Sequence, residues 1–176
     1  PVVRLFSFVQ PKGRARIQIE IDGTYIECPD SEGTTLIRED IIRPAEPQLP
    51  EDAEMVEVPL IKLAWGRSGD KGDKANVGII ARQPEFLPYI YAALSEEIVA
   101  QRFSHFLPED APNHSACYVE RYLMPGCNGI NFLLHQVLGG GGMASIRNDA
   151  QGKGFGQLML DASIPVSAEI ADKISQ

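Results

Sequence analysis

The fold is decided around residues 60–81, which read LIKLAWGRSGDKGDKANVGIIA. The apolar stretches from Leu60 to Trp65 and from Val77 to Ala81 are typical of two buried strands. Residues 66–76 between them are rich in glycine and charge, so we expect a loop that the sheet beneath holds rigidly. This arrangement predicts a sheet-based domain rather than a bundle of helices.

Further helices and strands are expected downstream. Residues 84–106 predict one or two short helices, because apolar side chains recur at helical spacing and Ser95 precedes two glutamates, as at a helix start. Residues 117–124 predict a strand, and residues 143–147 and 156–164 predict a final hairpin. Between these lies an expected amphipathic helix that ends at Gly139, with apolar side chains at i, i+3, i+4, i+7 and i+8: Ile130, Leu133, Leu134, Val137 and Leu138.

The N-terminal part has a different character. Strands are expected at residues 2–9, 17–21 and 24–28, with a type I′ turn at Asp22-Gly23. Residues 29–58 hold four prolines, two basic and nine acidic residues, a net of 2 − 9 = −7, which predicts an acidic linker. Residues 1–28 are then a β-rich hairpin extension, and residues 59–176 an α+β domain, a two-layer sandwich with its helices on one face of the sheet. Since the chain begins with Pro1, we expect a piece of a longer protein or a processed product.

Composition excludes several classes of function. The formal net charge is −8, which argues against nucleic acid and anionic membranes as partners, because such a surface repels phosphate. No apolar run approaches the roughly 18 residues of a transmembrane helix, and the N-terminus lacks a secretory signal. The three cysteines are widely spaced and form no CxxC pair, so neither a zinc knuckle nor a disulfide scaffold is expected. We therefore expect a cytoplasmic protein with reduced thiols.

The glycine- and charge-rich stretch at residues 65–76 is the densest chemical signal. Its glycines permit positive φ, so backbone N–H groups can converge on an anion, and Arg67, Lys71 and Lys74 add positive charge. The stretch lacks the GK[ST] ending of a P-loop and the carboxylate spacing of an EF-hand. Two interpretations stay open: an anion site, or a tight turn tied together by internal Arg–Asp and Lys–Asp pairs.

Three other places could contribute to a site. The glycines at residues 139–142 either let a ligand approach the backbone, pack closely, or form a flexible connection. Asn131 and His135 share a polar face of the helix expected at residues 130–138, which either lines a pocket or is solvated. Arg147 either serves an anion or is an ordinary exposed cation. We expect no metal or cofactor, name no catalytic residue, and take as candidate ligand-binding residues Arg67, Ser68, Gly69, Asp70, Lys71, Gly72, Asp73, Asn76, Asn131, His135, Gly140, Gly141 and Arg147.

Residues 63–78, LAWGRSGDKGDKANVG, resemble the AtuA-like family, named for acyclic terpene utilisation. The resemblance extends over about residues 59–165, through Arg121-Tyr122, Pro125-Gly126, Asn131-Phe132, the glycine run and Gln151-Gly152-Lys153. It implies a small C-terminal ferredoxin-like domain that follows a larger N-terminal domain or stands beside it as a separate protein. It brings no catalytic residues. The expected order of elements has one strand more than a plain βαββαβ unit, so either the first or the last hairpin decorates the fold.

The resemblance implies a setting in the bacterial breakdown of acyclic terpenes such as citronellol and geraniol, through acyl-CoA intermediates. Two functions stand as alternatives. The first is a non-catalytic accessory or assembly domain, whose partner is the larger domain of the same or a companion chain in a homo-oligomer. The second is a catalytic or ligand-binding domain that acts on an acyl-CoA or another anionic small molecule through residues 67–73. Whether the protein is an enzyme stays open.

Overall fold

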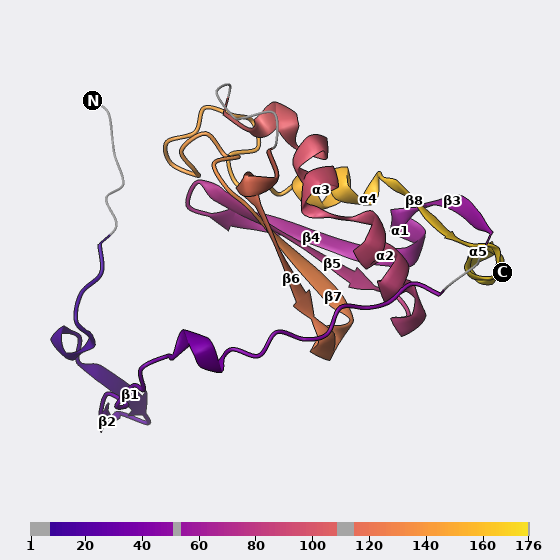
Figure 1. Cartoon of the computed structure of the whole chain (residues 1–176). Coiled ribbons are helices and arrows are strands. Elements are labelled where there is room, and N and C mark those ends of the chain that lie inside the picture. The colour runs from indigo at the N-terminus through magenta and orange to yellow at the C-terminus, as the bar shows by residue number, and fades with distance from the viewer. Residues whose placement is uncertain (1–7, 51–53, 109–114, 176) are drawn as a thin grey trace. The chain divides into compact units, whose positions relative to one another are not determined.

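The computed structural model describes residues 8–50, 54–108 and 115–175. The chain divides into two compact units, Pro1–Arg43 and Pro44–Gln176 (Figure 1). Among the described residues, none of the helices is both long and apolar enough to cross a membrane.

The described residues of the first unit contain one β-hairpin. Strands β1 (Ile17–Ile21) and β2 (Thr24–Cys28) pair antiparallel, and Asp22 and Gly23 between them both have positive φ, at 48° and 77°. This confirms the predicted hairpin and its type I′ turn. Short 3-10 turns lie at Lys12–Arg14 and Arg38–Asp40. Of the strand expected at residues 2–9, residues 2–7 lie outside the described residues, and residues 8 and 9 are not in a strand.

The second unit contains both helices and strands among its described residues. It also has 3-10 turns at Pro84–Phe86, Ser104–Phe106, Ser115–Tyr118 and Pro125–Cys127. Its regular elements in chain order are β3 (Met55–Pro59), α1 (Leu60–Leu63), β4 (Ala64–Lys71), β5 (Lys74–Ala81), α2 (Leu87–Ala93), α3 (Glu96–Arg102), β6 (Val119–Met124), β7 (Gly129–Leu134), α4 (Phe155–Leu160), β8 (Ser163–Ser167) and α5 (Ala168–Ser175).

Four of these strands form an antiparallel sheet in the order β4-β5-β7-β6 (Figure 1). Since β7 lies between β5 and β6, the segment β5-α2-α3-β6 is a split β-α-β unit, as in ferredoxin-like folds. The edge beside β5 is occupied by β4, which comes before β5 in the chain. The later strand β8 pairs instead with β3 in a separate two-stranded sheet. The fold is therefore α+β, as expected.

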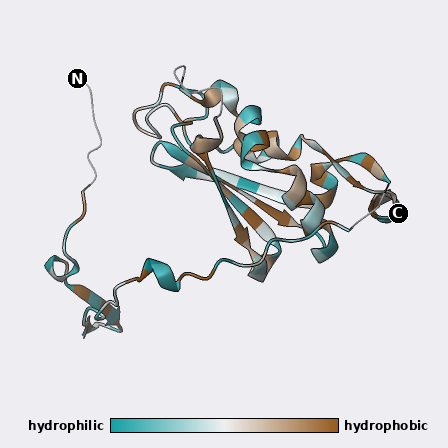
Figure 2. Cartoon of the chain, in the orientation of Figure 1, coloured by the Kyte–Doolittle hydropathy of each residue, from teal (hydrophilic) through white to brown (hydrophobic). Residues whose placement is uncertain are grey.

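One face of the four-stranded sheet forms the core. Alternate residues of β5 and β7 are buried, and Figure 2 shows hydrophobic segments along these strands. Helix α4 packs tightly on β4 at this face, because a Cβ on Gly66 would lie 2.9 Å from a Leu160 side-chain carbon. Helix α3 begins at the predicted N-cap, where Ser95 Oγ accepts the N–H of Ile98 at 3.3 Å.

Two predictions around β4 are wrong. Residues 60–63 are one helical turn rather than a strand, since this turn buries both Leu60 and Leu63. Residues 66–76 are not a loop. Ala64–Lys71 and Lys74–Ala81 are paired strands whose register runs unbroken from Ala64↔Ala81 to Lys71↔Lys74. The backbone hydrogen bonds of this hairpin outweigh the weak strand preference of glycine.

The predicted last helix and last hairpin are also wrong. Residues 129–134 form strand β7, because Ile130, Phe132 and Leu134 alternate into the core between β5 and β6. Residues 143–147 are not in a strand, and residues 155–160 form helix α4, which buries Phe155 and Met159 one turn apart. Strand β8 pairs with β3, so the segment expected as a linker at residues 29–58 contains a strand at its C-terminal end.

Candidate functional site

The second face of the four-stranded sheet carries no helix of this unit among the described residues, and we call it the open face. Its side chains come from alternate positions on each strand, and the strand register groups them into cross-strand rows. The first row is largely apolar: Trp65, Ile80, Gly129 and Met124. Apart from Leu133, the residues of the next rows are polar or lack a side chain: Arg67, Gly78, Asn131 and Tyr122, then Gly69, Asn76, Leu133 and Glu120, with Lys71 and Lys74 beside the turn.

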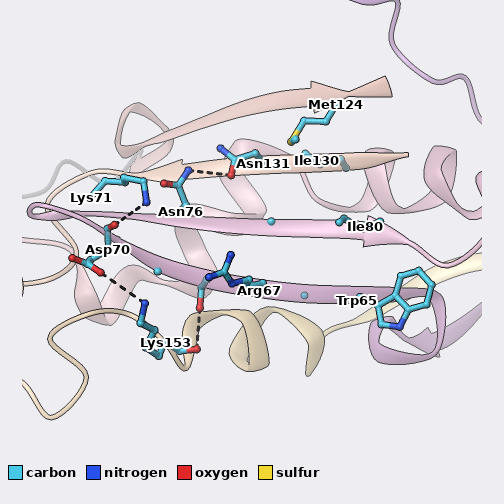
Figure 3. Close-up of a pocket in the computed structure, with 14 residues that line it drawn as sticks. Trp65, Arg67, Asp70, Lys71, Asn76, Ile80, Met124, Ile130, Asn131 and Lys153 are labelled. Carbon is cyan, nitrogen blue, oxygen red and sulfur yellow. Dashed lines mark hydrogen bonds and ion pairs between the residues drawn. The ribbon is translucent and has the colours of Figure 1, made fainter. Parts of the chain in front are cut away.

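The open face is hollowed over Gly69 and Gly78, where side chains are missing (Figure 3). A cavity of about 500 Å³ lies there, lined by β4, β5, β7, Met124 and Lys153. A Cβ on Gly78 would meet its nearest heavy atom, the Arg67 carbonyl oxygen, at 3.7 Å, an ordinary contact. The backbone at Gly78 could therefore accept a side chain, and its absence keeps the hollow open.

Positive charge gathers around this hollow. Arg67 is exposed, and no hydrogen bond or ion pair of its guanidinium is found among the described residues. Lys153 reaches the β4 edge from the loop before α4 and lies 3.9 Å from the Asp70 carboxylate, while Lys71 Nζ donates to the Asp70 carbonyl oxygen at 3.0 Å (Figure 3). Asp70 thus lies within ion-pair distance of Lys153, whereas neither Arg67 nor Lys71 has a carboxylate partner among the described residues.

Two amides lie side by side on the floor of the hollow. Asn76 Nδ2 donates to Asn131 Oδ1 at 3.0 Å, and the two side chains point toward one another from β5 and β7 (Figure 3). The Asn76 Oδ1 atom is buried and has no hydrogen-bond partner among the described residues. An unsatisfied buried acceptor carries a desolvation cost, so a donor brought to this oxygen would be stabilising.

The position of Lys153 is fixed by hydrogen bonds beneath it. Ser68 Oγ donates to the Lys153 carbonyl oxygen at 3.0 Å and accepts the Gly156 N–H at 2.8 Å. The Asp149 carboxylate accepts the N–H groups of Lys153 and Gly154, both at 2.8 Å. Ser68 therefore faces the core and positions the edge of the hollow.

The turn of the β4–β5 hairpin joins the glycine run. Asp73 Oδ1 accepts the N–H of Gly140 at 2.7 Å, and the Asp73 carbonyl oxygen accepts the N–H of Val137 at 3.2 Å. Gly141 approaches so closely that a Cβ on it would lie 2.4 Å from the Gly72 carbonyl oxygen. The structure places Gly72, Asp73, Gly140 and Gly141 together in this junction, outside the lining of the hollow.

A second polar cluster lies at the β6 edge of the open face. His135 Nε2 and Glu120 Oε1 are 2.5 Å apart, and Tyr122 donates a hydrogen bond to the other Glu120 oxygen. These hydrogen bonds, first from Tyr122 and then from His135, hold the pKa of the Glu120 carboxyl below its ordinary value. The helix face expected to carry Asn131 and His135 does not exist. Asn131 lies in β7, and His135 directly follows this strand.

Arg147 does not line the hollow. Its guanidinium donates to the carbonyl oxygens of Val137 and Phe106, and it lies 5.8 Å from the centroid of the Phe106 ring. It ties the segment after the glycine run to the segment after α3.

The match to known families falls on this same region. Residues 58–165, more than half of the chain, match the AtuA ferredoxin-like domain. The protein belongs to the AtuA ferredoxin-like family. No curated protein and no solved structure matches the chain.

Seven of the candidate residues in this AtuA-like domain line the hollow: Arg67, Ser68, Gly69, Asp70, Lys71, Asn76 and Asn131. Sequence reasoning missed the apolar end, Trp65, Ile80 and Met124, and left Lys153 outside the candidates. The alternation along residues 65–71 would have placed Trp65 on the same face as Arg67, had the stretch been assigned as a strand. In residues 8–50, 54–108 and 115–175, we find no group of three or more His, Cys, Asp or Glu side chains that could hold a metal.

Proposed function

We propose that the AtuA-like domain binds an anionic small molecule on the open face of its sheet. The observation that carries this proposal is Arg67, an exposed guanidinium at the wall of a 500 Å³ hollow with no counter-ion among the described residues. Guanidinium groups provide several donors in a fixed fork that suits a carboxylate or phosphate.

The charge distribution supports an anion. The chain as a whole has a net charge of −8, yet three cations and one carboxylate line the hollow: Arg67, Lys71, Lys153 and Asp70. A local excess of positive charge on an acidic protein attracts an anion at that place. The two N–H donors on the Asn131 amide are also compatible with an anion, since Asn131 already uses its oxygen to accept from Asn76.

The proposal concerns binding and assigns no reaction. The link of the family to acyclic terpene breakdown makes an acyl-CoA one candidate ligand, but it rests on the resemblance and not on the geometry of the hollow. A phosphate-bearing ligand of this kind would place its charges near Lys71 and Lys153.

An accessory or assembly role is the second candidate, and exposed apolar side chains favour it. Trp65 is 53% exposed, and Ile80 and Met124 are also exposed at the same end of the open face. In the first unit, the isoleucines of the β1–β2 hairpin are exposed too, and a two-stranded hairpin is marginal by itself. Contact with a larger companion domain or with further copies of this chain would cover such groups.

Trp65 provides the test, because it is the only tryptophan in the chain. Titration with inorganic phosphate, acetate and coenzyme A, followed by Trp65 fluorescence and calorimetry, should show saturable binding of at least one anion. Arg67→Ala should weaken this binding tenfold or more, since hydrogen bonds to charged groups contribute about 1.5–3 kcal/mol. Arg38→Ala removes the same charge from the first unit and should leave binding unchanged.

Binding that is absent for all three anions, or equal in both variants, would contradict the ligand site. Sedimentation of the parent and of a Trp65→Ser, Ile80→Ser double variant addresses the second candidate. Loss of an oligomer in the double variant would favour an assembly surface at the apolar row. Unchanged sedimentation would argue against assembly through these two side chains.

A further inference from the structure

We infer that the ligand of the open face is a small amphipathic monocarboxylate, with its carboxylate over Gly78 and its apolar part along Trp65, Ile80 and Met124. This inference rests on the proposed anion site and adds the class of the ligand.

The position of the carboxylate follows from one cross-strand row. Arg67 pairs with Gly78, and Gly78 pairs with Asn131, so a side-chain-free position lies between a guanidinium and an amide. Neighbouring strands are about 4.8 Å apart, which puts the backbones of Arg67 and Asn131 about 10 Å apart with Gly78 midway. A planar carboxylate over Gly78 can accept two N–H groups from the Arg67 guanidinium, with the Asn131 amide in the same row on the next strand.

The charge available at that position suits a single negative charge. Lys153 is held beside Asp70, and Lys71 lies four residues farther along β4, about 13 Å away, with its ammonium on the Asp70 carbonyl. Arg67 is then the cation next to Gly78 that lacks a counter-ion among the described residues. Lys71 also lacks an ion pair among the described residues, but Arg67 is the cation in the same cross-strand row as Gly78, and a single carboxylate there matches its one charge.

The apolar end begins one row away. Trp65 and Ile80 lie two residues from Arg67 and Gly78 along their strands, about 7 Å, and Met124 faces them across Gly129. The Trp65 ring is held in place by Arg82, whose guanidinium lies 4.8 Å from the ring centroid and donates to the Ile61 carbonyl. An apolar chain attached to the carboxylate would cover these exposed side chains and gain from their burial.

Calorimetric titration of the full chain with acetate, butanoate, hexanoate and octanoate tests the inference. We expect the affinity to rise by roughly two- to fourfold per added methylene until the chain outgrows the apolar row. Hexanol and hexylamine, which keep the chain and lose the negative charge, should bind at least tenfold more weakly than hexanoate. Hexyl phosphate should bind no better than hexanoate.

Two variants test the charged end and the apolar end of the site separately. Arg67→Ala should weaken all four carboxylates by a similar factor, whereas Ile80→Ser should weaken octanoate and leave acetate unchanged. Leu158→Ser, an exposed apolar position on α4 outside the hollow, is the matched control and should change neither.

These titrations distinguish failure of the amphipathic-ligand inference from failure of the proposed anion site. Binding of acetate or phosphate with no dependence on chain length overturns the amphipathic ligand and leaves the anion site standing. Tighter binding of hexyl phosphate than of hexanoate overturns the choice of a carboxylate. Binding that is lost for every anion overturns both the inference and the proposed function.

Discussion

The Asp73 carboxylate accepts the backbone N–H of Gly140 at 2.7 Å, although the two residues are 67 positions apart in the chain. This bond joins the turn of the β4–β5 hairpin to the glycine run. Asp73 and Arg67 lie in the same charged motif but have separate roles. The Asp73 carboxylate accepts a hydrogen bond from the protein's own backbone, whereas the Arg67 guanidinium is exposed beside the hollow.

Asp73→Ala should lower the free energy of unfolding by about 1 kcal/mol, because it removes an acceptor from a solvent-accessible backbone donor. Ligand binding at the hollow should persist. The measurement is urea unfolding of the full chain. Asp172→Ala, an exposed aspartate of α5, is the control and should change stability little. If Asp73→Ala abolished anion binding without lowering stability, the structural role assigned to Asp73 would be wrong.

Neighbouring glycines of the run should respond very differently to alanine. Gly141 has φ of +80°, and a Cβ there would lie 2.4 Å from the Gly72 carbonyl oxygen, so Gly141→Ala should cost at least about 2 kcal/mol. Gly142 has no atom within 4 Å of an added Cβ, and Gly142→Ala should be near neutral. Thermal melting of both variants checks this. Equal melting midpoints would mean that the run does not pack on the hairpin turn.

The Glu120 cluster should make a pH-dependent contribution to stability. Because the folded-state pKa of Glu120 lies below its ordinary value, the stabilisation is present above that ordinary value and is lost as pH falls through the folded-state pKa. Glu120→Gln should therefore cost up to about 1 kcal/mol at pH 7, as for partly exposed pairs, and nothing at a pH below the folded-state pKa. Unfolding curves at pH 7 and at the lowest pH at which the parent stays folded test this.

Glu39→Gln, an exposed glutamate of the first unit, is the control for that experiment and should differ little from the parent at either pH. If Glu120→Gln lowered stability equally at both pH values, the effect would come from packing and not from the charge of the carboxylate.

Local signals allowed part of the fold to be predicted. Asp22-Gly23 between alternating strands and Ser95 before two glutamates each act within a few residues, and both predictions are confirmed. The resemblance carried by residues 63–78 also led to the correct family. These features depend on short-range backbone geometry or on a specific motif, so the sequence holds the information directly.

The open face could not be predicted because it depends on contacts between distant segments. Residues 66–76 contain three glycines and read as a loop, whereas the pairing of β4 with β5 and the packing of β4 under α4 make residues 66–71 and 74–76 strands on either side of a short turn. Once the strand is known, alternation places Trp65 beside Arg67. Lys153 reaches the same edge through Ser68, which is 85 residues away from it. No residue spacing within either segment predicts this contact.

The sequence of residues 130–138 fits both a helical and a strand periodicity. Two substitutions in this segment distinguish the helix from the strand. The helical pattern would place Leu133 in the core, whereas strand β7 buries Phe132 completely and places Leu133 on the open face. Phe132→Ala should therefore cost about 3–5 kcal/mol, and Leu133→Ala about 1 kcal/mol or less, because Leu133 is only partly buried. Urea unfolding with both variants measures the difference. A larger loss for Leu133→Ala would favour the helix and remove the floor of the hollow, since Asn131 would no longer face Arg67 across Gly78.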